Sequence, residues 1–330
     1  MNDMKQISRY SYPNTRIRAM LSTLLDEEFF VRAQRAGFQE FIGMLDKTLY
    51  GGIIQKVRNG ISPENFELAC RDFDSQSIKK ISAFFTGKNE KQLILSLAER
   101  YWFDRLKFAL RMWFKKQMPE GENLTEEFSS ILTAKTIDDV IKTIQNKEYA
   151  RTIEEAKDNF EKTGSLYVVE MSLDRQYFLK LQNAVEHLSE TDKKITRTII
   201  GAEIDRENLS WLARIRLYYA GKLDLEKVYF IPGGQHFSEK NLKDLMKQDS
   251  SQRFFNIPAQ YLELIETLPE KISEMDSMLE SIIIQEIRKA LISNPFTAGI
   301  PLGYIFLKQR ETKRIISLFV SKYFETRTYQ

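Results

Sequence analysis

Apolar residues recur every three or four positions along most of this 330-residue chain, which is the spacing of one face of an amphipathic α-helix. Near the N-terminus, for example, Ile17, Met20, Leu21 and Leu24 share one face. Runs of this kind, separated by turn-forming residues, predict an all-α fold. The predicted helices cover residues 14–25, 27–36, 38–50, 63–73, 74–85, 91–116, 124–133, 137–145, 148–162, 172–188, 195–219, 238–248, 257–293 and 301–324.

The breaks between these helices are predicted from Pro, Gly and capping residues, because each of them interrupts helical hydrogen bonding or favours a helix start. One short apolar run has β-branched residues and is predicted to be extended before it becomes helical. The predicted breaks are a turn over Tyr12–Thr15 with Asn14 or Thr15 as the N-cap, a helix end at Gly51-Gly52, the β-prone run 166–171, and an interruption near Pro269.

The stretch 199–238 combines an apolar helix with charged residues on the face that should be buried. Asp205, Asn208 and Arg216 lie along nearly the same line, and Asp205 and Arg216 are three turns apart, too far to pair within the helix. If this face is covered, each needs a partner elsewhere in the chain or on another protein, because a buried unpaired charge is costly. If it is exposed, the charges are ordinary solvated groups. Gly233 and Gly234, which follow Pro232, fit a tight loop or a cradle for an anion.

Composition narrows the class of protein. Lys and Arg number 49 and Asp and Glu 46, so the near-zero net charge disfavours a dedicated nucleic-acid binder. A hydrophobic content of 42% supports a packed core, and the low numbers of glycines (14) and prolines (8) favour helices.

Cys70 is the single cysteine, so no internal disulfide can form and a reducing, cytoplasmic compartment is expected. The N-terminal residues lack the apolar region of a signal peptide. No uncharged apolar run reaches the roughly 18 residues needed to cross a bilayer. We therefore expect a soluble chain whose membrane association, if any, is peripheral.

Motifs for catalysis and cofactors are scarce. Neither Gly-Lys pair, at 87–88 or at 221–222, has the upstream glycine that a phosphate-binding loop requires. His187 and His236 are the only histidines and do not have zinc-motif spacing. The sequence thus predicts no metal and no cofactor, and disfavours an enzyme.

A short pattern occurs three times, and it is either chance or the mark of a threefold helical repeat. Each copy has a basic-aliphatic-basic triplet within an apolar helix and a later aromatic residue. The triplets are Arg16-Ile17-Arg18, Arg105-Leu106-Lys107 and Arg214-Ile215-Arg216, and the aromatic residues are Tyr50, Tyr149 and Phe254.

Four segments resemble the C subunit of bacterial and archaeal V-type (A-type) rotary ATPases, in a family that includes the d subunit of eukaryotic vacuolar ATPases. They follow the family's order along the chain, whereas about 50–165 matches only in helical character. The matching residues are Arg16 and Arg18 within Tyr12–Leu25; Leu173, Asp174, Tyr177 and Leu181; Gly201, Glu203, Asp205, Asn208, Leu212, Arg214 and Arg216 with Pro232, Gly233 and Gly234; and Tyr304, Lys308 and Glu311.

The resemblance implies three similar helical domains in a pseudo-threefold arrangement that forms a funnel, at 1–90, 91–195 and 196–330. It leaves room for the C-terminal helix to pack back on the first domain. The resemblance also implies a non-catalytic rotor subunit on the cytoplasmic face of the membrane. Such a subunit joins the axle of D and F subunits to the ring of proteolipid subunits, and so links ATP turnover in the A/B head to H⁺ or Na⁺ transport.

Each matching residue also has a purely structural interpretation. Lys308 and Glu311 fit an ordinary surface pair, and Asp174 fits a helix cap. Arg16, Arg18, Arg214 and Arg216 would either line a socket for the axle or hold domains together. Two other functions stay open: a helical scaffold, and a nucleic-acid-binding protein using the basic-aromatic stretch Arg100–Lys116.

Overall fold

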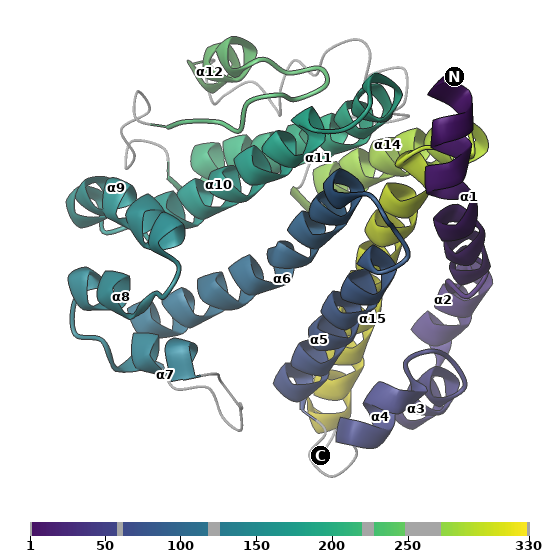
Figure 1. Cartoon of the computed structure of the whole chain (residues 1–330). Coiled ribbons are helices and arrows are strands. Elements are labelled where there is room, and N and C mark those ends of the chain that lie inside the picture. Colours follow the sequence, from purple (N-terminus) through teal and green to yellow (C-terminus); the bar gives the residue numbers. More distant parts are fainter. Residues whose placement is uncertain (1, 58–61, 118–125, 220–227, 248–271, 329–330) are drawn as a thin grey trace. The chain divides into compact units, whose positions relative to one another are not determined.

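The computed structural model describes residues 2–57, 62–117, 126–219, 228–247 and 272–328. Within these ranges every regular element is a helix, so the predicted all-α fold is confirmed (Figure 1). The described residues form two compact units. Unit 1 comprises the chain up to Tyr101 together with the segment from Pro295 onward, and unit 2 comprises the residues between Trp102 and Asn294.

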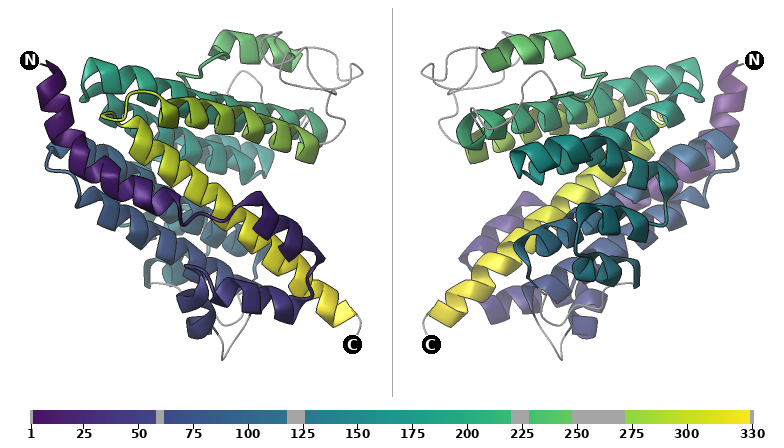
Figure 2. Two further views of the ribbon diagram at one scale, coloured as in Figure 1. Left: turned by 90° about the vertical axis from the view of Figure 1, so that its right-hand side faces the viewer. Right: turned by 90° about the vertical axis from the view of Figure 1, so that its left-hand side faces the viewer.

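Unit 1 is built around the C-terminal helix, which runs alongside helices from the beginning of the chain (Figure 2). Aromatic side chains from distant parts of the sequence fill the core, where the Phe66 and Phe319 rings stack with centroids 3.9 Å apart. The helices of unit 1 are α1 (Asn2–Leu21), α2 (Glu27–Arg35), α3 (Phe38–Asp46), α4 (Gly51–Val57), α5 (Pro63–Ser82) and α15 (Gly299–Thr328), with the first half of α6 (Lys88–Lys115).

The predicted turn at Tyr12–Thr15 is wrong, because α1 is one helix with Pro13 inside it. Asn14 does not cap a helix either. Its side-chain amide donates hydrogen bonds to the carbonyls of Pro295 (2.6 Å) and Thr297 (3.0 Å), just before α15. These tertiary contacts and the burial of Pro13 and Asn14 outweigh the local tendency of proline to end a helix.

Two more boundaries in unit 1 differ from prediction. Gly51 begins α4 instead of ending the previous helix, and a β-carbon at Gly51 would collide with the Asp46 carbonyl. The predicted break before Asp74 is absent because α5 continues to Ser82. Its predicted start is confirmed, since the Ser62 hydroxyl accepts a hydrogen bond from the Asn65 amide.

Unit 2 packs its helices pairwise, with α9 against α10, α10 against α11, and α11 against α14. Rings from α6, α9 and α10 share a core in which Phe103 lies 4.6 Å from Tyr149 and 5.6 Å from Tyr177. Besides the second half of α6, its helices are α7 (Glu126–Thr133), α8 (Ile137–Thr143), α9 (Lys147–Thr163), α10 (Tyr167–Glu186), α11 (Glu190–Tyr218), α12 (Glu239–Lys247) and α14 (Ile272–Ile292).

The β-prone run at 166–171 is helical from Tyr167 onward, so that prediction is wrong. Residues 166–169 are all buried, and a continuous apolar run is as typical of a buried helix as of a strand. The predicted start of the helix at Ile137 is confirmed as that of α8, where Thr136 is the N-cap and forms a capping box with Asp139.

The three-domain division at residues 90 and 195 and the funnel remain predictions. The central residue of each repeated triplet is buried, as are Tyr50 and Tyr149, whereas Phe254 and the predicted break at Pro269 lie outside the described residues. Among the described helices, none combines the length and the apolar character needed to span a bilayer.

Candidate functional site

Asp205, in the buried part of α11, holds the loop that follows the helix. Its side chain is 1% exposed, and its two oxygens accept hydrogen bonds from the backbone amides of His236 (2.8 Å) and Phe237 (3.3 Å). Amide groups that donate to a buried carboxylate stabilise its charge. The loop backbone is therefore a partner of Asp205 from elsewhere in the chain.

Asn208, one turn further along α11, binds the same loop from the other side of the Pro-Gly-Gly sequence. Its amide donates to the Ile231 carbonyl (2.8 Å), and its carbonyl accepts from the Ile231 amide (2.9 Å). Asn208 is completely buried, so each of these bonds replaces one that water would otherwise make. Asp205 and Asn208 together fix residues 231–237 against α11.

The glycines of this region allow the close approach. Gly233 has a φ of 84°, and a β-carbon at Gly234 would collide with the Asp205 carboxylate. Gly201 of α11 accepts a hydrogen bond from the Gln235 amide, and a β-carbon there would lie 3.0 Å from that nitrogen. The tight loop proposed from the sequence accounts for Gly233 and Gly234 without an anion.

A cleft of about 390 Å³ lies beside this loop, between α10, α11 and residues 233–235. At its rim Arg197 donates two hydrogen bonds of 2.7 Å to the Glu186 carboxylate, and these bonds lower the pKa of Glu186. The Gln182 side-chain amide donates to the Pro232 carbonyl. Glu186 and Arg197 are thus already bound to each other, and Gln182 to the backbone of the loop.

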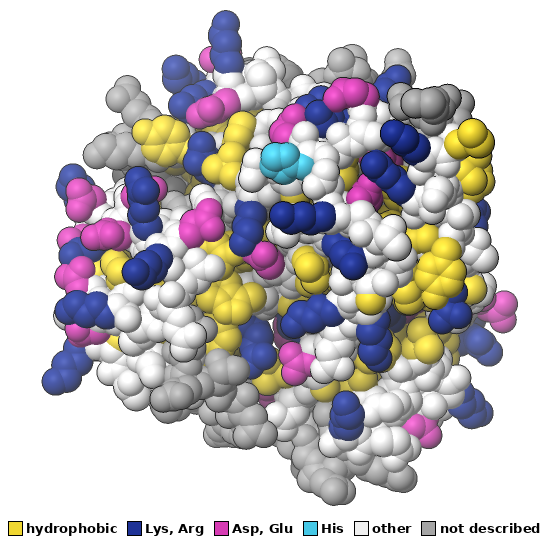
Figure 3. All heavy atoms as spheres, in the orientation of Figure 1, with side chains coloured by type: hydrophobic (Ala, Val, Ile, Leu, Met, Phe, Trp, Pro, Cys, Tyr) yellow, Lys and Arg dark blue, Asp and Glu magenta, His cyan; other side chains and the backbone are white. Residues whose placement is uncertain are grey.

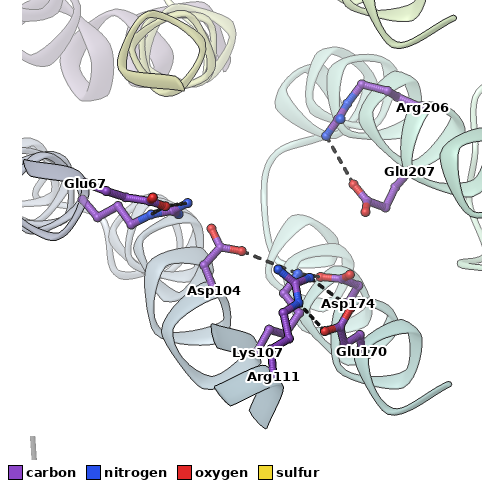
Figure 4. Close-up of polar contacts among 9 residues, drawn as sticks. Glu67, Asp104, Lys107, Arg111, Glu170, Asp174, Arg206 and Glu207 are labelled. Atoms are coloured by element: carbon purple, nitrogen blue, oxygen red, sulfur yellow. Dashed lines mark hydrogen bonds and ion pairs between the residues drawn. The ribbon is translucent and has the colours of Figure 1, made fainter. Parts of the chain in front are cut away.

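Asp174 lies in the middle of α10, so its predicted capping role is wrong. Lys107 of α6 donates to its carboxylate at 2.6 Å, and both side chains are buried (Figure 4). Arg111 lies one turn further along α6 and contacts Glu170 of α10. Two ion pairs therefore join α6 to α10 inside unit 2. Tyr177, also predicted, is a core residue packed edge-on against Phe103.

The four predicted arginines belong to two helices, Arg16 and Arg18 to α1 and Arg214 and Arg216 to α11. Arg16 and Arg18 are exposed on α1, and the Arg16 guanidinium lies 5.7 Å from the centre of the Phe84 ring. Arg214 is half-buried in α11. Burial raises the pKa of the nearby Tyr167, and the charge and hydrogen bond of Arg214 oppose this rise only in part. Arg216 belongs to α11, but its side chain lies outside the described residues.

Lys308 and Glu311 form a buried pair, so their interpretation as a surface pair is wrong. Their side chains are 3% and 5% exposed, and Lys308 Nζ lies 2.7 Å from Glu311 Oε1. Both contact the hydroxyl of Tyr50, which accepts from Lys308 (2.8 Å) and donates to Glu311 (2.9 Å). The other Glu311 oxygen accepts from the Leu25 amide. We call Tyr50, Lys308 and Glu311 the Tyr50 centre.

Tyr304 lies on the same line of α15, and its side chain is also buried. Burial and the neighbouring carboxylates of Asp74 and Glu311 raise its pKa. Burial and the charge of Glu311 likewise raise the pKa of Tyr50, so both phenols keep their protons.

Sequence reasoning missed Asp74 as a member of this polar region. It is 1% exposed, and one of its oxygens accepts a hydrogen bond from the Tyr101 hydroxyl (3.2 Å). Burial raises the pKa of Asp74 to about 6, although Lys308 and the Thr312 and Tyr101 hydroxyls act in the opposite direction. One cation and one carboxylate already balance here, so a second carboxylate favours its neutral form. The one signal in the sequence was the position of Asp74 on a helix face that is otherwise apolar, with Cys70 and Ile78 as its neighbours.

Among the described residues, no group of His, Cys, Asp and Glu has the geometry to hold a metal ion. Cys70 is buried, and burial raises the pKa of its thiol. The surface drawn in Figure 3 mixes Lys and Arg with Asp, Glu and apolar side chains. Over the described residues, these features define an all-helical protein in which Asp174, Asp205, Asn208, Lys308 and Glu311 bind its own backbone and side chains.

Comparison with known proteins gives the family. The ATP synthase (C/AC39) subunit family matches residues 13–327. The A-type ATP synthase C subunit of Methanocaldococcus jannaschii is 21% identical, over 96% of this chain and 83% of the relative. Its counterpart from Methanothermobacter thermautotrophicus is 25% identical, over 95% and 84%. The chain belongs to the ATP synthase (C/AC39) subunit family, and the resemblance found in its sequence is confirmed.

Proposed function

We propose that this chain is a non-catalytic subunit of the central stalk of a V/A-type rotary ATPase. In this role it joins the D/F axle to the membrane ring of proteolipid subunits, on the cytoplasmic face. ATP hydrolysis or synthesis in the A/B head is thereby linked to H⁺ or Na⁺ transport. The observation that carries the proposal is the family match over residues 13–327, with relatives named as the C subunit of A-type ATP synthases.

The side-chain contacts support a mechanical role. A part that transmits torque must resist twisting, and close-packed interiors have low compressibility. Inside unit 1, Lys308 and Glu311 of α15 bind Tyr50, which directly precedes α4. Glu311 also binds the amide of Leu25, two residues before α2. Inside unit 2, Asp205 and Asn208 fix the loop 231–237 to α11, and Lys107 joins α6 to α10. Buried polar bonds of this kind have defined directions, so they oppose sliding between helices.

The predicted residues then divide by role. Asp174, Tyr177, Asp205, Asn208, Tyr304, Lys308 and Glu311 are buried and hold the units together internally. Arg16 and Arg18 are exposed, so they are the predicted residues best placed to contact another subunit. Charged residues at such a surface set the orientation and the association rate of a partner.

The experiment is direct binding of the purified full chain to a purified D–F complex and, separately, to the detergent-solubilised ring, measured by calorimetry. We expect a one-to-one complex with each. A helical scaffold unrelated to rotary ATPases would bind neither, and that result would refute the proposal. A nucleic-acid-binding protein would instead bind RNA with an affinity that falls steeply as salt rises.

A further inference from the structure

Two segments of unit 1 that contact each other carry basic residues and no acidic ones. Residues 4–25 contain no Asp or Glu, and neither do residues 75–89, which end α5 and begin α6. The two segments touch: Tyr10 packs against Phe85 at 6.0 Å and Tyr12 against Phe84 at 6.1 Å. Glu90, the acid that follows the second segment, is buried and already paired with Arg9 at 3.3 Å.

Three of the four cations of α1, Lys5, Arg9 and Arg16, fall on one line of the helix, and Arg18 lies off it. At about 100° per residue, Lys5, Arg9, Tyr12 and Arg16 lie within a sector of about 60°, and they span about 16 Å along the axis. All four side chains are exposed. We call these four residues, with the adjoining Phe84, the basic stripe. Lys79 and Lys80, in the last turn of α5, are exposed four to five residues before Phe84.

The stripe is partly preorganised. The Arg16 guanidinium lies over the Phe84 ring, which limits its rotamers and presents its N–H groups in a fixed orientation. Within the described part of the chain, neither Lys5 nor Arg16 forms an ion pair. A guanidinium held in this way matches the paired oxygens of a carboxylate.

The exposed apolar side chains of α1 lie elsewhere on the helix. Met4 is 74% exposed and Ile7 43% exposed, but both are more than about 100° around the helix from the centre of the stripe. A helix that lies in a lipid surface needs an apolar face that stays exposed along its length. In α1 that face is already used inside unit 1, since Tyr10 and Ile17 are completely buried, and this favours a protein partner over a membrane.

We propose that the basic stripe is a docking surface for an acidic α-helix of a partner subunit, whose carboxylates repeat at i, i+4, i+7 and i+11. The repeat follows from the line of Lys5, Arg9, Tyr12 and Arg16, because a helix lying alongside α1 presents side chains at the same intervals. This inference adds the chemistry of one partner to the proposed function. It rests on that function in one respect, that the partner is a subunit of the same complex.

The test uses the full chain and labelled helical peptides, with binding followed by fluorescence anisotropy at about 50 mM salt. One peptide carries Glu at i, i+4, i+7 and i+11, and a second has the same composition with its Glu residues spread around the helix. We expect the first to bind about tenfold more tightly than the second. R16E should weaken its binding about tenfold, and the double variant K5E/R16E more. R151E, at an exposed arginine of α9, is the matched control and should change nothing.

A charge swap sharpens the test. The K5E/R16E variant should bind a peptide with Lys at i, i+4, i+7 and i+11 better than the original protein does. The inference is overturned if both Glu peptides bind equally, or if R151E acts like R16E. It is also overturned if phosphatidylserine vesicles or a 12-nucleotide RNA bind through the same residues more tightly than the peptide. Calorimetry with the D–F complex and the ring does not use these peptides. A negative result with the peptides would therefore overturn the docking surface and not the proposed function.

Discussion

Units 1 and 2 each contain a buried tyrosine whose hydroxyl accepts a hydrogen bond from a lysine, but the two lysines differ in burial. Lys308 is 3% exposed, lies 2.8 Å from the Tyr50 hydroxyl and 4.1 Å from the centre of its ring, and has Glu311 beside it. Lys180 is half-buried, 3.1 Å from the Tyr149 hydroxyl and 5.5 Å from its ring centre.

The comparison shows what burial requires. A lysine that solvent can reach keeps much of its hydration, so its stability depends less on any one neighbour. A lysine removed from water needs a full counter-charge, because the desolvation of an ammonium group costs several kcal/mol. Glu311 supplies that charge, and the Tyr50 hydroxyl joins both ions in one network. We therefore expect substitutions in the Tyr50 centre to be far more costly than matching ones around Tyr149.

The largest expected effect comes from Glu311→Gln. It removes the carboxylate that buried Lys308 binds directly and should lower the free energy of unfolding by about 3–5 kcal/mol. Urea unfolding followed by far-UV circular dichroism measures the loss. Glu155→Gln is the control, because Glu155 and its partner Arg151 are exposed and such pairs contribute less than about 1 kcal/mol. Equal effects of the two substitutions would contradict the comparison.

Asp74→Asn should change how stability depends on pH. The pKa of Asp74 is raised from 3.8 to about 6, so between these values the folded chain binds its proton more tightly than the unfolded chain. This contribution to stability is fully present below pH 4 and is lost as the pH rises through 6. Relative to the original protein, D74N should gain up to about 3 kcal/mol between pH 4 and pH 7.5.

Urea unfolding of both proteins, at steps of half a pH unit, measures the difference between their free energies of unfolding. Groups that titrate alike in the two proteins cancel in this difference. D74N should approach a constant advantage above pH 7. A difference that does not vary with pH would mean that Asp74 is already ionised in the folded chain near pH 4, and would contradict the charge balance inferred for the Tyr50 centre.

The smallest effects are expected from removing the hydroxyls. Tyr50→Phe leaves Lys308 and Glu311 each short of one buried hydrogen bond and should cost about 2 kcal/mol. Tyr149→Phe should cost about 0.5–1 kcal/mol, because water can replace the lost bond to half-buried Lys180. All three tryptophans, at 102, 113 and 211, lie in unit 2, so tryptophan fluorescence follows Tyr149→Phe while circular dichroism follows both. A cost for Tyr149→Phe equal to that of Tyr50→Phe would contradict the comparison.

The helices could be predicted from sequence because each carries its own periodic apolar face. Local rules failed where a distant contact decided the conformation. Pro13 stays inside α1 because the neighbouring Asn14 binds carbonyls 281 and 283 residues away. Residues 166–171 show the same limit, since a continuous apolar run does not reveal whether its surroundings bury a strand or a helix.

The candidate site divides in the same way. The line of Tyr304, Lys308 and Glu311 could be predicted because it lies on one helix. Their partner Tyr50 could not, since 258 residues separate it from Lys308. Asp205 was predicted to need a partner, but no sequence rule indicates that the backbone of residues 236 and 237 supplies it.

The central claim is that this chain couples the axle to the ring and takes no part in the chemistry of ATP. It is tested most directly by reconstituting the complete ATPase in vesicles with and without the chain. We predict that the complex lacking it still hydrolyses ATP in the A/B head but no longer drives ion uptake, and that adding the purified chain restores uptake. Ion uptake that proceeds without the chain, or hydrolysis by the head that is lost without it, would contradict the claim.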